Sequence, residues 1–233
     1  MSDHMKRLAM PKTWPIPKKV HLWATKQSAG AHSVENSMPA TLVLRDMLKV
    51  CDTASEAKKI VAARDLIVNG KAVKDAKAPI GIMDVVSLPK MGVNYRVLLT
   101  SKGKIAFVPI SADDAKWILC RIENKTKVAG GKMQLNLSGG RNVVIDANKY
   151  STGDTVKINL EDNSIIADYP LAQDAVVLVI SGRHIGAIET VDKYTVVNRP
   201  TENTITFKDN TETVKKNVFV IGSGKSELPE VSE

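Results

Sequence analysis

The sequence predicts an α+β protein of several domains, in which a helical part that ends in a hairpin is followed by β-rich parts. Apolar residues recur at helical spacing in residues 44–51, and a second helical pattern follows at residues 53–61. An Asn-Gly pair at residues 69–70 separates two short apolar runs, which is typical of a tight hairpin turn. From residue 175 onward, short alternating segments follow one another closely, as in a small β-barrel.

Residues 1–41 are predicted to form a basic extended arm. Prolines interrupt this segment repeatedly and it shows no sustained apolar periodicity, so it lacks a core of its own. Its first 30 residues hold six Lys and Arg but only one acidic residue, with Trp14 and Trp23 among them. We expect the arm to supply charge for phosphates and rings for stacking, and to order only on binding.

The first predicted helix has an apolar stripe formed by Leu44, Met47, Leu48 and Cys51. Burying this stripe turns Arg45 outward. Because the helix is short, it has to pack against the elements that follow it.

The second predicted helix begins at Thr53, which forms a capping box with Glu56. Its free backbone amides and the positive end of its dipole attract phosphate. The hairpin at residues 66–73 follows, and the helices and the hairpin together form one domain at residues 42–105.

Residues 106–172 are predicted to form a central β-rich domain interrupted by one helix, which Ser111 and Asp114 cap. Gly-Gly turns at residues 130–131 and 139–140 separate alternating strands. The apolar stripe of the predicted helix consists of Ala115, Ile118, Leu119 and Ile122.

The small barrel is predicted at residues 173–222. Residues 223–233 are polar and acidic, so they are predicted to form a disordered tail. The barrel strands are predicted at 176–180, 186–191, 194–197, 204–208 and 218–221.

Positive charge is concentrated in the first two thirds of the chain, although the whole protein carries +8. Residues 1–150 hold 25 Lys and Arg against 12 Asp and Glu, a net charge of +13, whereas residues 151–233 hold 8 against 13, a net charge of −5. A one-sided excess of this kind favours a polyanionic partner such as nucleic acid.

The sequence offers no signal for a membrane, a metal or a cofactor. No run reaches the roughly 18 apolar residues that span a bilayer, so we expect a cytoplasmic protein with no membrane partner. Cys51 and Cys120 are predicted to be small buried core residues rather than a disulfide or zinc site. The four histidines lack metal-ligand spacing.

A series of segments resembles the archaeal and eukaryotic-type small-subunit ribosomal proteins of the S-four-e family, in the family's order and over nearly the whole chain. These segments are KRLAMPKTWPIPKK, LVLRDMLKVCDTASEAKKI, PIGIMDVVSLP, YRVLL, LCRIENKTKVAGGKMQLNL, GRNVVI and ISGRHIGAI. The resemblance implies a helical RNA-binding fold at about 42–105, a central β-rich domain and a C-terminal KOW-type (SH3-like) small β-barrel.

The resemblance also implies a structural constituent of the small ribosomal subunit, with no catalytic residue, that binds ribosomal RNA by shape and phosphate contacts. Its expected partners are small-subunit ribosomal RNA and neighbouring ribosomal proteins, and off the ribosome it is expected to be monomeric. The RNA-facing candidates carried over by position are Arg45, Thr53, Ser55, Lys58, Lys59 and Lys71, with Arg183 and His184 in the KOW loop. Charge and ring chemistry add Lys12, Trp14, Lys18 and Lys19 in the arm, and Lys125, Lys127, Lys132 and Arg141 around the central turns.

Two positions depart from the family pattern. Arg64 stands where relatives often end the second helix with glycine, so either the turn there differs or Arg64 bears left-handed strain of about 1 kcal/mol. After Gly186 the family often has a basic residue, but Ala187, Ile188 and Glu189 follow here, which disfavours direct RNA contact by the barrel.

Two rival functions stay open from the sequence alone. One is an RNA-modifying enzyme, because similar small RNA-binding folds occur attached to catalytic domains. Asp113 and Asp114 could form a carboxylate pair for such an enzyme, but they begin a predicted helix, where the helix dipole favours acidic residues. The other is a translation-associated factor that binds the ribosome transiently.

Overall fold

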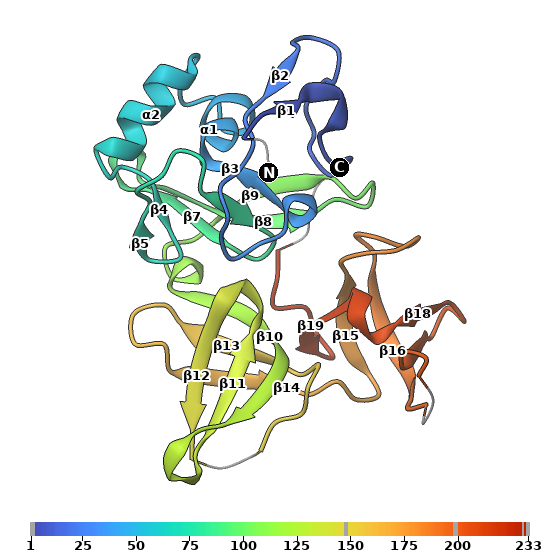
Figure 1. The fold of residues 1–233 in the computed structure, drawn as a ribbon. Coiled ribbons are helices and arrows are strands. Elements are labelled where there is room, and N and C mark those ends of the chain that lie inside the picture. The colour runs from blue at the N-terminus through green and yellow to red at the C-terminus, as the bar shows by residue number, and fades with distance from the viewer. Residues whose placement is uncertain (1–2, 147–148, 198–199, 230, 232–233) are drawn as a thin grey trace. The chain divides into compact units, whose positions relative to one another are not determined.

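The protein is mostly β-sheet with few helices, and its chain divides into two compact units (Figure 1). The first unit holds Met1–Leu98 and Lys104–Ile118, and the second holds Leu99–Gly103 and Leu119–Glu233. The boundaries predicted between arm, helical domain, central domain, barrel and tail stay predictions. The structure, a computed structural model, describes residues 3–146, 149–197, 200–229 and 231.

A five-stranded sheet in the order β5-β4-β7-β8-β9 organises the first unit. The predicted hairpin is confirmed: Asn69 and Gly70 join β4 to β5 with φ angles of 51° and 75°, as a type I′ turn requires. The strands are β4 (Ile67–Val68), β5 (Lys71–Ala72), β7 (Val85–Leu88), β8 (Val93–Leu99) and β9 (Ile105–Ile110). Two further pairs are β1 (Met5–Lys6) with β2 (Trp23–Ala24), and β3 (Ser37–Pro39) with β6 (Pro79–Gly81).

The first helix differs from the prediction because it is only partly an α-helix. A single turn, α1 (Ala40–Leu42), continues as a π-helix over Val43–Met47, and the Leu48 N–H donates to the Val43 carbonyl, 2.9 Å away and five residues earlier. The wider turn rotates the following side chains away from their expected positions. The buried face is therefore residues 40–44, and the predicted stripe is wrong at Met47 and Leu48, which are only half-buried.

The second helix, α2 (Ala54–Ala62), begins and ends as the sequence predicts. The Glu56 N–H donates to the Thr53 hydroxyl at 3.2 Å, and the Thr53 N–H donates to the Glu56 carboxylate at 3.3 Å, which confirms the capping box. At the other end, the Arg64 N–H donates to the Val61 carbonyl, and Arg64 has a φ of 63°. This is a Schellman ending with arginine in the left-handed position that favours glycine.

The N-terminal segment is not the extended arm that the prolines predict, because it contributes to the core of the first unit. Met10 and Trp14 are 2% and 1% exposed, and the Trp14 indole N–H donates to the Ser37 carbonyl at 2.7 Å. The Ile105 N–H donates to the Thr13 carbonyl at 2.9 Å, which ties the segment to the start of β9. The prediction missed this because the anchors are isolated apolar residues with no period.

A buried network around Asp84 joins the N-terminal segment to the turn between β6 and β7. The Asp84 carboxylate accepts hydrogen bonds from the Asn69 amide (2.7 Å) and the Gly81 N–H (2.8 Å), and His32 Nε2 lies 3.0 Å from its Oδ2. The His32 ring leaves no room for a β-carbon at Gly81. Burial alone lowers the pKa of His32, but the hydrogen bond and the charge of Asp84 outweigh burial and raise it above 6.5.

The central sheet of the second unit has the order β12-β11-β10-β13-β14, and the glycine turns at residues 130–131 and 139–140 are confirmed. The predicted helix over 111–122 is wrong. Ser111 does cap Asp114, but only as a 3-10 turn, and the apolar residues that follow lie in β10, where Ile118 to Cys120 are all buried. A continuous apolar run fits either a buried strand or a helix, so spacing alone could not decide. The strands are β10 (Trp117–Lys127), β11 (Met133–Leu137), β12 (Arg141–Ile145), β13 (Thr155–Asn159) and β14 (Ile165–Tyr169).

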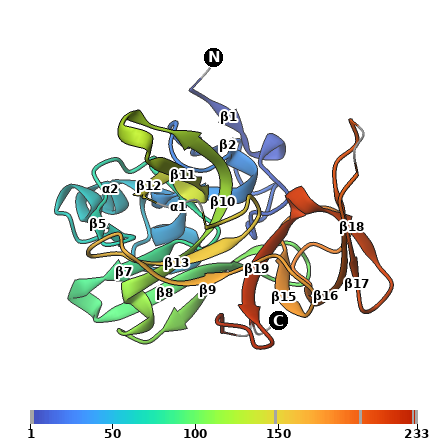
Figure 2. The same cartoon turned by 90° about the horizontal axis from the view of Figure 1, so that it is seen from below.

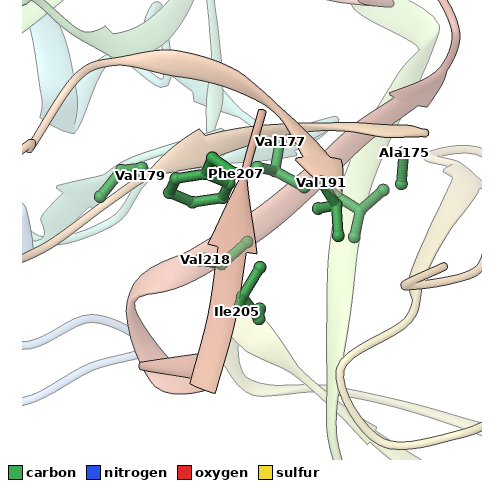
Figure 3. Close-up of a cluster of buried hydrophobic side chains, with 8 residues drawn as sticks. Ala175, Val177, Val179, Val191, Ile205, Phe207 and Val218 are labelled. Carbon is green, nitrogen blue, oxygen red and sulfur yellow. The ribbon is translucent and has the colours of Figure 1, made fainter. Parts of the chain in front are cut away.

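The C-terminal part of the second unit is a five-stranded sheet in the order β18-β17-β16-β15-β19 (Figure 2). Its core is a cluster that includes Val177, Val191, Ile205 and Phe207 (Figure 3). Two predicted strands, 186–191 and 194–197, are largely one strand, β16, with a register shift after Val191. The bounds are β15 (Ala175–Val179), β16 (Ile188–Thr195), β17 (Thr204–Phe207), β18 (Glu212–Val214) and β19 (Val218–Ser223).

The chain after β19 is more ordered than the predicted tail. Leu228 is 8% exposed, and the Glu227 carboxylate lies 2.8 Å from the Lys157 ammonium on β13. A hydrogen bond to Glu227, together with burial as the larger cause, raises the pKa of Tyr169 to about 12. The prediction of disorder is therefore wrong for Glu227 and Leu228, while residues 230, 232 and 233 lie outside the described residues.

Replacing Arg64 by glycine should leave the free energy of unfolding unchanged or raise it by up to about 1 kcal/mol, because glycine relieves the left-handed strain but gains freedom when unfolded. Urea denaturation measures this. Arg64→Ala is the matched control, since it removes the side chain but keeps the strain, and it should give no gain. A clear loss of stability in Arg64→Gly would contradict the assigned strain.

Trp14→Ala should lower the free energy of unfolding by about 3–5 kcal/mol, since it empties a buried aromatic site. Trp23→Ala is the control within the same segment, because Trp23 is 51% exposed, and it should change stability by less than about 1 kcal/mol. Thermal and urea unfolding of both variants test the anchoring. Equal effects of the two substitutions would mean that the segment is not held by Trp14.

The His32–Asp84 pair should make stability depend on pH in a defined direction. Since the folded pKa of His32 is raised above 6.5, its contribution is fully present below about pH 6.5 and is lost as pH rises through the folded pKa. His32→Gln should remove this part of the pH dependence, measured by urea unfolding at several pH values. Identical pH profiles for the two proteins would contradict the assignment.

Candidate nucleic-acid interface

The exposed side of α2 and the adjoining hairpin carry unpaired positive charge. Lys58 and Lys59 project from α2 and Lys71 lies on β5, and all three are exposed. Across the described part of the chain, no carboxylate forms an ion pair with any of them. Phosphate contacts from such side chains cost little desolvation, because an exposed ammonium group stays partly hydrated when it contacts a phosphate.

The start of α2 is less favourable to phosphate than the sequence suggests. The Glu56 carboxylate accepts the backbone N–H groups of Asp52 (3.0 Å) and Thr53 (3.3 Å). These hydrogen bonds lower the pKa of Glu56, so a negative charge is fixed at the helix start. Thr53 and Ser55 are exposed there, but the lysine side chains carry the positive charge of this surface.

A groove of about 470 Å³ lies elsewhere on the first unit, between the N-terminal segment and the chain that follows the π-helix. Its charged lining consists of three cations, Arg7, Arg45 and Lys49, and two carboxylates, Asp46 and Asp52. Its apolar lining includes Ile16, Pro17 and Val20. We call it the Arg7 groove. The predicted candidate Arg45 belongs to this groove.

Arg45 is not the freely solvated cation that the helix pattern predicts. Its Nη2 and Nε donate to the two carboxylate oxygens of Asp46 at 2.8 and 3.3 Å, and both side chains are partly buried. An incoming phosphate has to compete with Asp46 for this guanidinium.

The candidates of the N-terminal segment fall into two groups. Lys12 and Lys19 are exposed, and the Lys18 ammonium donates to the Met10 carbonyl at 3.1 Å. The expectation that Trp14 stacks on bases is wrong, because its ring is enclosed by the core. Trp23 is the exposed ring, and the Lys6 ammonium lies 4.1 Å from its centroid.

In the second unit, most candidate cations already have protein partners. The Lys125 ammonium donates to the Tyr150 carbonyl at 2.7 Å, Lys132 lies 3.1 Å from Asp146, and Arg141 donates to the Asn163 side chain at 3.1 Å. Lys127 is exposed at the end of β10. These side chains offer phosphate less free charge than the α2 surface does.

The loop between β15 and β16 exposes Arg183 and His184 beside acidic groups. Burial raises the pKa of Glu189, and the charge and hydrogen bond of Asp209 raise it further, while His184 acts in the opposite direction. Gly186 in this loop has a φ of 84°, and a β-carbon there would collide with the Thr100 carbonyl. The acids fit the expectation that this loop is a weak RNA contact, which stays a prediction.

A second cleft, of about 410 Å³, lies within the second unit and includes Arg121 and Lys216 in its lining. Its charged side chains already have hydrogen-bond or ion-pair partners within the protein. Arg121 donates to Glu123 and to the Lys216 and Val218 carbonyls, and Lys216 lies 3.6 Å from Glu202. It is therefore a poorer phosphate site than the Arg7 groove.

Sequence reasoning missed Arg7 and Lys49 as candidate site residues. Arg7 is only one of several basic residues in the N-terminal segment, and a regular α-helix over residues 44–51 would turn Lys49 to solvent without placing it beside that segment. The groove combines residues 7–21 with residues 45–52, so it depends on tertiary packing rather than on a local motif.

Family models of known proteins match two parts of the chain, its first residues and its middle. The family model described as "Ribosomal family S4e" matches residues 91–165, and the "RS4NT (NUC023) domain" matches residues 1–35. The small ribosomal subunit protein eS4 of Methanothermobacter thermautotrophicus is 40% identical over 227 residues, which cover 96% of this chain and 93% of the relative. The chain belongs to the S4e family of ribosomal proteins. This family resemblance was predicted from the sequence and is confirmed.

Other members of the S4e family agree with this assignment. The eS4 protein of Methanocella arvoryzae is 41% identical over 223 residues, with 94% of each chain covered. The crystal structure of the 30S ribosomal protein S4e from Thermoplasma acidophilum matches with a TM-score of 0.70 and 26% identity, covering 81% of this chain and 96% of that one. The S4e family consists of structural, non-enzymatic proteins, so the rival interpretation as an RNA-modifying enzyme is excluded.

Within the described residues, no helix is long and apolar enough to cross a membrane. The same residues contain no group of three or more His, Cys, Asp or Glu side chains placed to hold a metal ion. Both predicted core cysteines, Cys51 and Cys120, are buried and are not joined in a disulfide.

Proposed function

We propose that this chain is a structural constituent of the small ribosomal subunit that binds ribosomal RNA through the first unit. The observation that carries the proposal is that Lys58 and Lys59 on α2 and Lys71 on β5 are exposed and form no ion pair within the described residues, in a chain whose relatives are named small ribosomal subunit proteins. The net charge of +13 over residues 1–150, a range that contains the first unit and the start of the second, supports RNA as the partner, because phosphate contacts dominate affinity for RNA.

The mode of binding follows from which side chains are exposed. Lysines on a short helix and a hairpin offer point charges to phosphates and no planar hydrogen-bonding groups to base edges. The contact is therefore with the shape and backbone of folded RNA. Lys12 and Lys19 extend this contact along the N-terminal segment.

The finer description of the fold is part of the proposal. We assign the C-terminal sheet β18-β17-β16-β15-β19 to a KOW-type (SH3-like) small barrel, attached to a central β-rich domain and a helical RNA-binding domain. The acids around its loop favour a neighbouring ribosomal protein as the barrel's partner, rather than RNA. The protein is assigned to cytoplasmic ribosomes, and off the ribosome to a monomer.

A transient translation factor is the remaining alternative. A resident protein should be present at about one copy per small subunit after washing in high salt, whereas a visitor is removed by the wash. Quantitative mass spectrometry of washed subunits distinguishes the two. Substoichiometric amounts after the wash would contradict residence.

The double variant Lys58→Glu/Lys59→Glu should weaken binding to small-subunit ribosomal RNA by at least about tenfold, at roughly 1 kcal/mol or more per lost phosphate contact. The salt dependence of binding should also become shallower by about two in slope, since each phosphate contact contributes about one. Filter binding at several salt concentrations measures both quantities. The fold should be unchanged, because both side chains are exposed.

Lys193→Glu/Lys225→Glu is the matched control, because it makes the same change of charge at two exposed lysines of the second unit. The control should leave affinity for the RNA within about threefold of the wild type, because salt screens charges that do not themselves contact phosphate. If both double variants weaken binding equally, the effect is one of net charge and α2 is not the RNA surface.

A further inference from the structure

The Arg7 side chain is a buried cation that lines a groove. It is 4% exposed, and in the described part of the chain its one side-chain hydrogen bond is from Nε to the Pro17 carbonyl at 2.6 Å. No carboxylate there forms an ion pair with it. A buried guanidinium without a counter-ion is costly, and an anion held in the groove would supply one.

The opposite wall of the Arg7 groove brings further cations to the same space. Lys49 is exposed directly after the π-helix, in a left-handed conformation with a φ of 52°. A non-glycine residue in that conformation is strained, and such strain concentrates at functional sites. Arg45 is beside it, held by Asp46 in a two-point ion pair.

The rest of the lining holds three apolar side chains together with His21, Cys51 and the exposed Asp52. Ile16, Pro17 and Val20 contribute to the wall on the side of the N-terminal segment, and Val20 is 59% exposed. An inorganic anion alone gains nothing from these side chains. A nucleobase does gain contact energy there, because apolar side chains beside an anion site can pack against the flat face of the base.

We propose that the Arg7 groove binds one unstacked nucleotide of RNA, with the phosphate at Arg7 and Lys49 and the base against Ile16, Pro17 and Val20. This inference rests on the proposed function, since it places one specific nucleotide contact on the same ribosomal RNA. The groove's volume of about 470 Å³ lies within the range of pockets that hold small ligands. Asp46 sets the affinity, because it competes with the phosphate for Arg45.

The direct test uses adenosine 5′-monophosphate, adenosine and inorganic phosphate as probes of the full-length protein, followed by NMR chemical shifts. The monophosphate should bind and shift signals of residues 16–20 and 45–52, more tightly than either adenosine or phosphate alone. Equal binding of phosphate and the monophosphate would overturn the base contact. Absence of binding at millimolar concentration, or preference for a glutamate-rich peptide, would overturn the nucleotide assignment as a whole.

Two substitutions with opposite expected effects separate this site from a structural role. Lys49→Gln should weaken the monophosphate about fivefold to tenfold, by loss of one charge-assisted contact, and it is exposed enough to leave the fold intact. Asp46→Asn should strengthen binding about threefold or more, by releasing Arg45 from its ion pair. Arg7→Gln should abolish binding of the monophosphate. Because Arg7 is buried, this variant could unfold the protein. Lys49→Gln then still tests the site, since Lys49 is exposed.

Asp113→Asn is the matched control for Asp46→Asn. Asp113 also pairs with a neighbouring cation, Lys116 at 2.7 Å, and belongs to the same unit, but it is not part of the groove. The two variants change net charge equally. A gain in affinity for Asp46→Asn but not for Asp113→Asn supports the groove, whereas equal gains would show a general charge effect and overturn it.

Ribosomal RNA itself distinguishes failure of this inference from failure of the proposed function. Chemical probing of the RNA should show one unpaired nucleotide that the wild-type protein protects from the reagent. The same nucleotide should react with the reagent when Lys49→Gln is bound instead. If the Lys49 variant leaves every protection unchanged while Lys58→Glu/Lys59→Glu weakens binding, the groove inference is wrong and the proposed function stands. If no variant affects binding, both are wrong.

Discussion

Burial of the Trp14 ring is the constraint on which the first unit's surface depends. A segment with many prolines and few apolar residues has little reason to fold alone, but one enclosed indole with a hydrogen bond to Ser37 fixes its middle. The basic residues on either side of Trp14 then become a fixed part of the surface instead of a flexible tail. Arg7 lines a groove only because the segment is held in this way.

Local chemistry explains which parts of the fold could be predicted. The capping box of Thr53 and Glu56, the Asn69-Gly70 turn and the left-handed Arg64 each depend on a few neighbouring residues, and all three are present in the structure. The errors concern features set by distant residues. The Trp14 indole donates to Ser37, 23 residues further along the chain. The run that begins at Trp117 is a strand because β11 and β13 flank it in the sheet.

The candidate site divides in the same way. The lysines of α2 could be assigned to solvent from helical spacing alone, and they are exposed. The state of Arg45 could not be predicted, because helical spacing shows which side chains are turned outward but not that Arg45 pairs with its neighbour Asp46. Net charge therefore overstates the cations that are free to bind phosphate, since part of the positive charge is neutralised inside the protein.

The π-helix makes the Arg7 groove tolerant of a change in chain length at this point. A π-turn holds one residue more than an α-turn, so removing one residue from Val43–Met47 would restore regular α-helical winding and leave Lys49 at the Arg7 groove. The same deletion within the regular helix α2 would rotate every side chain that follows it by about 100°. Gain or loss of one residue is therefore absorbed beside the groove, where a regular helix would have displaced the cations that follow.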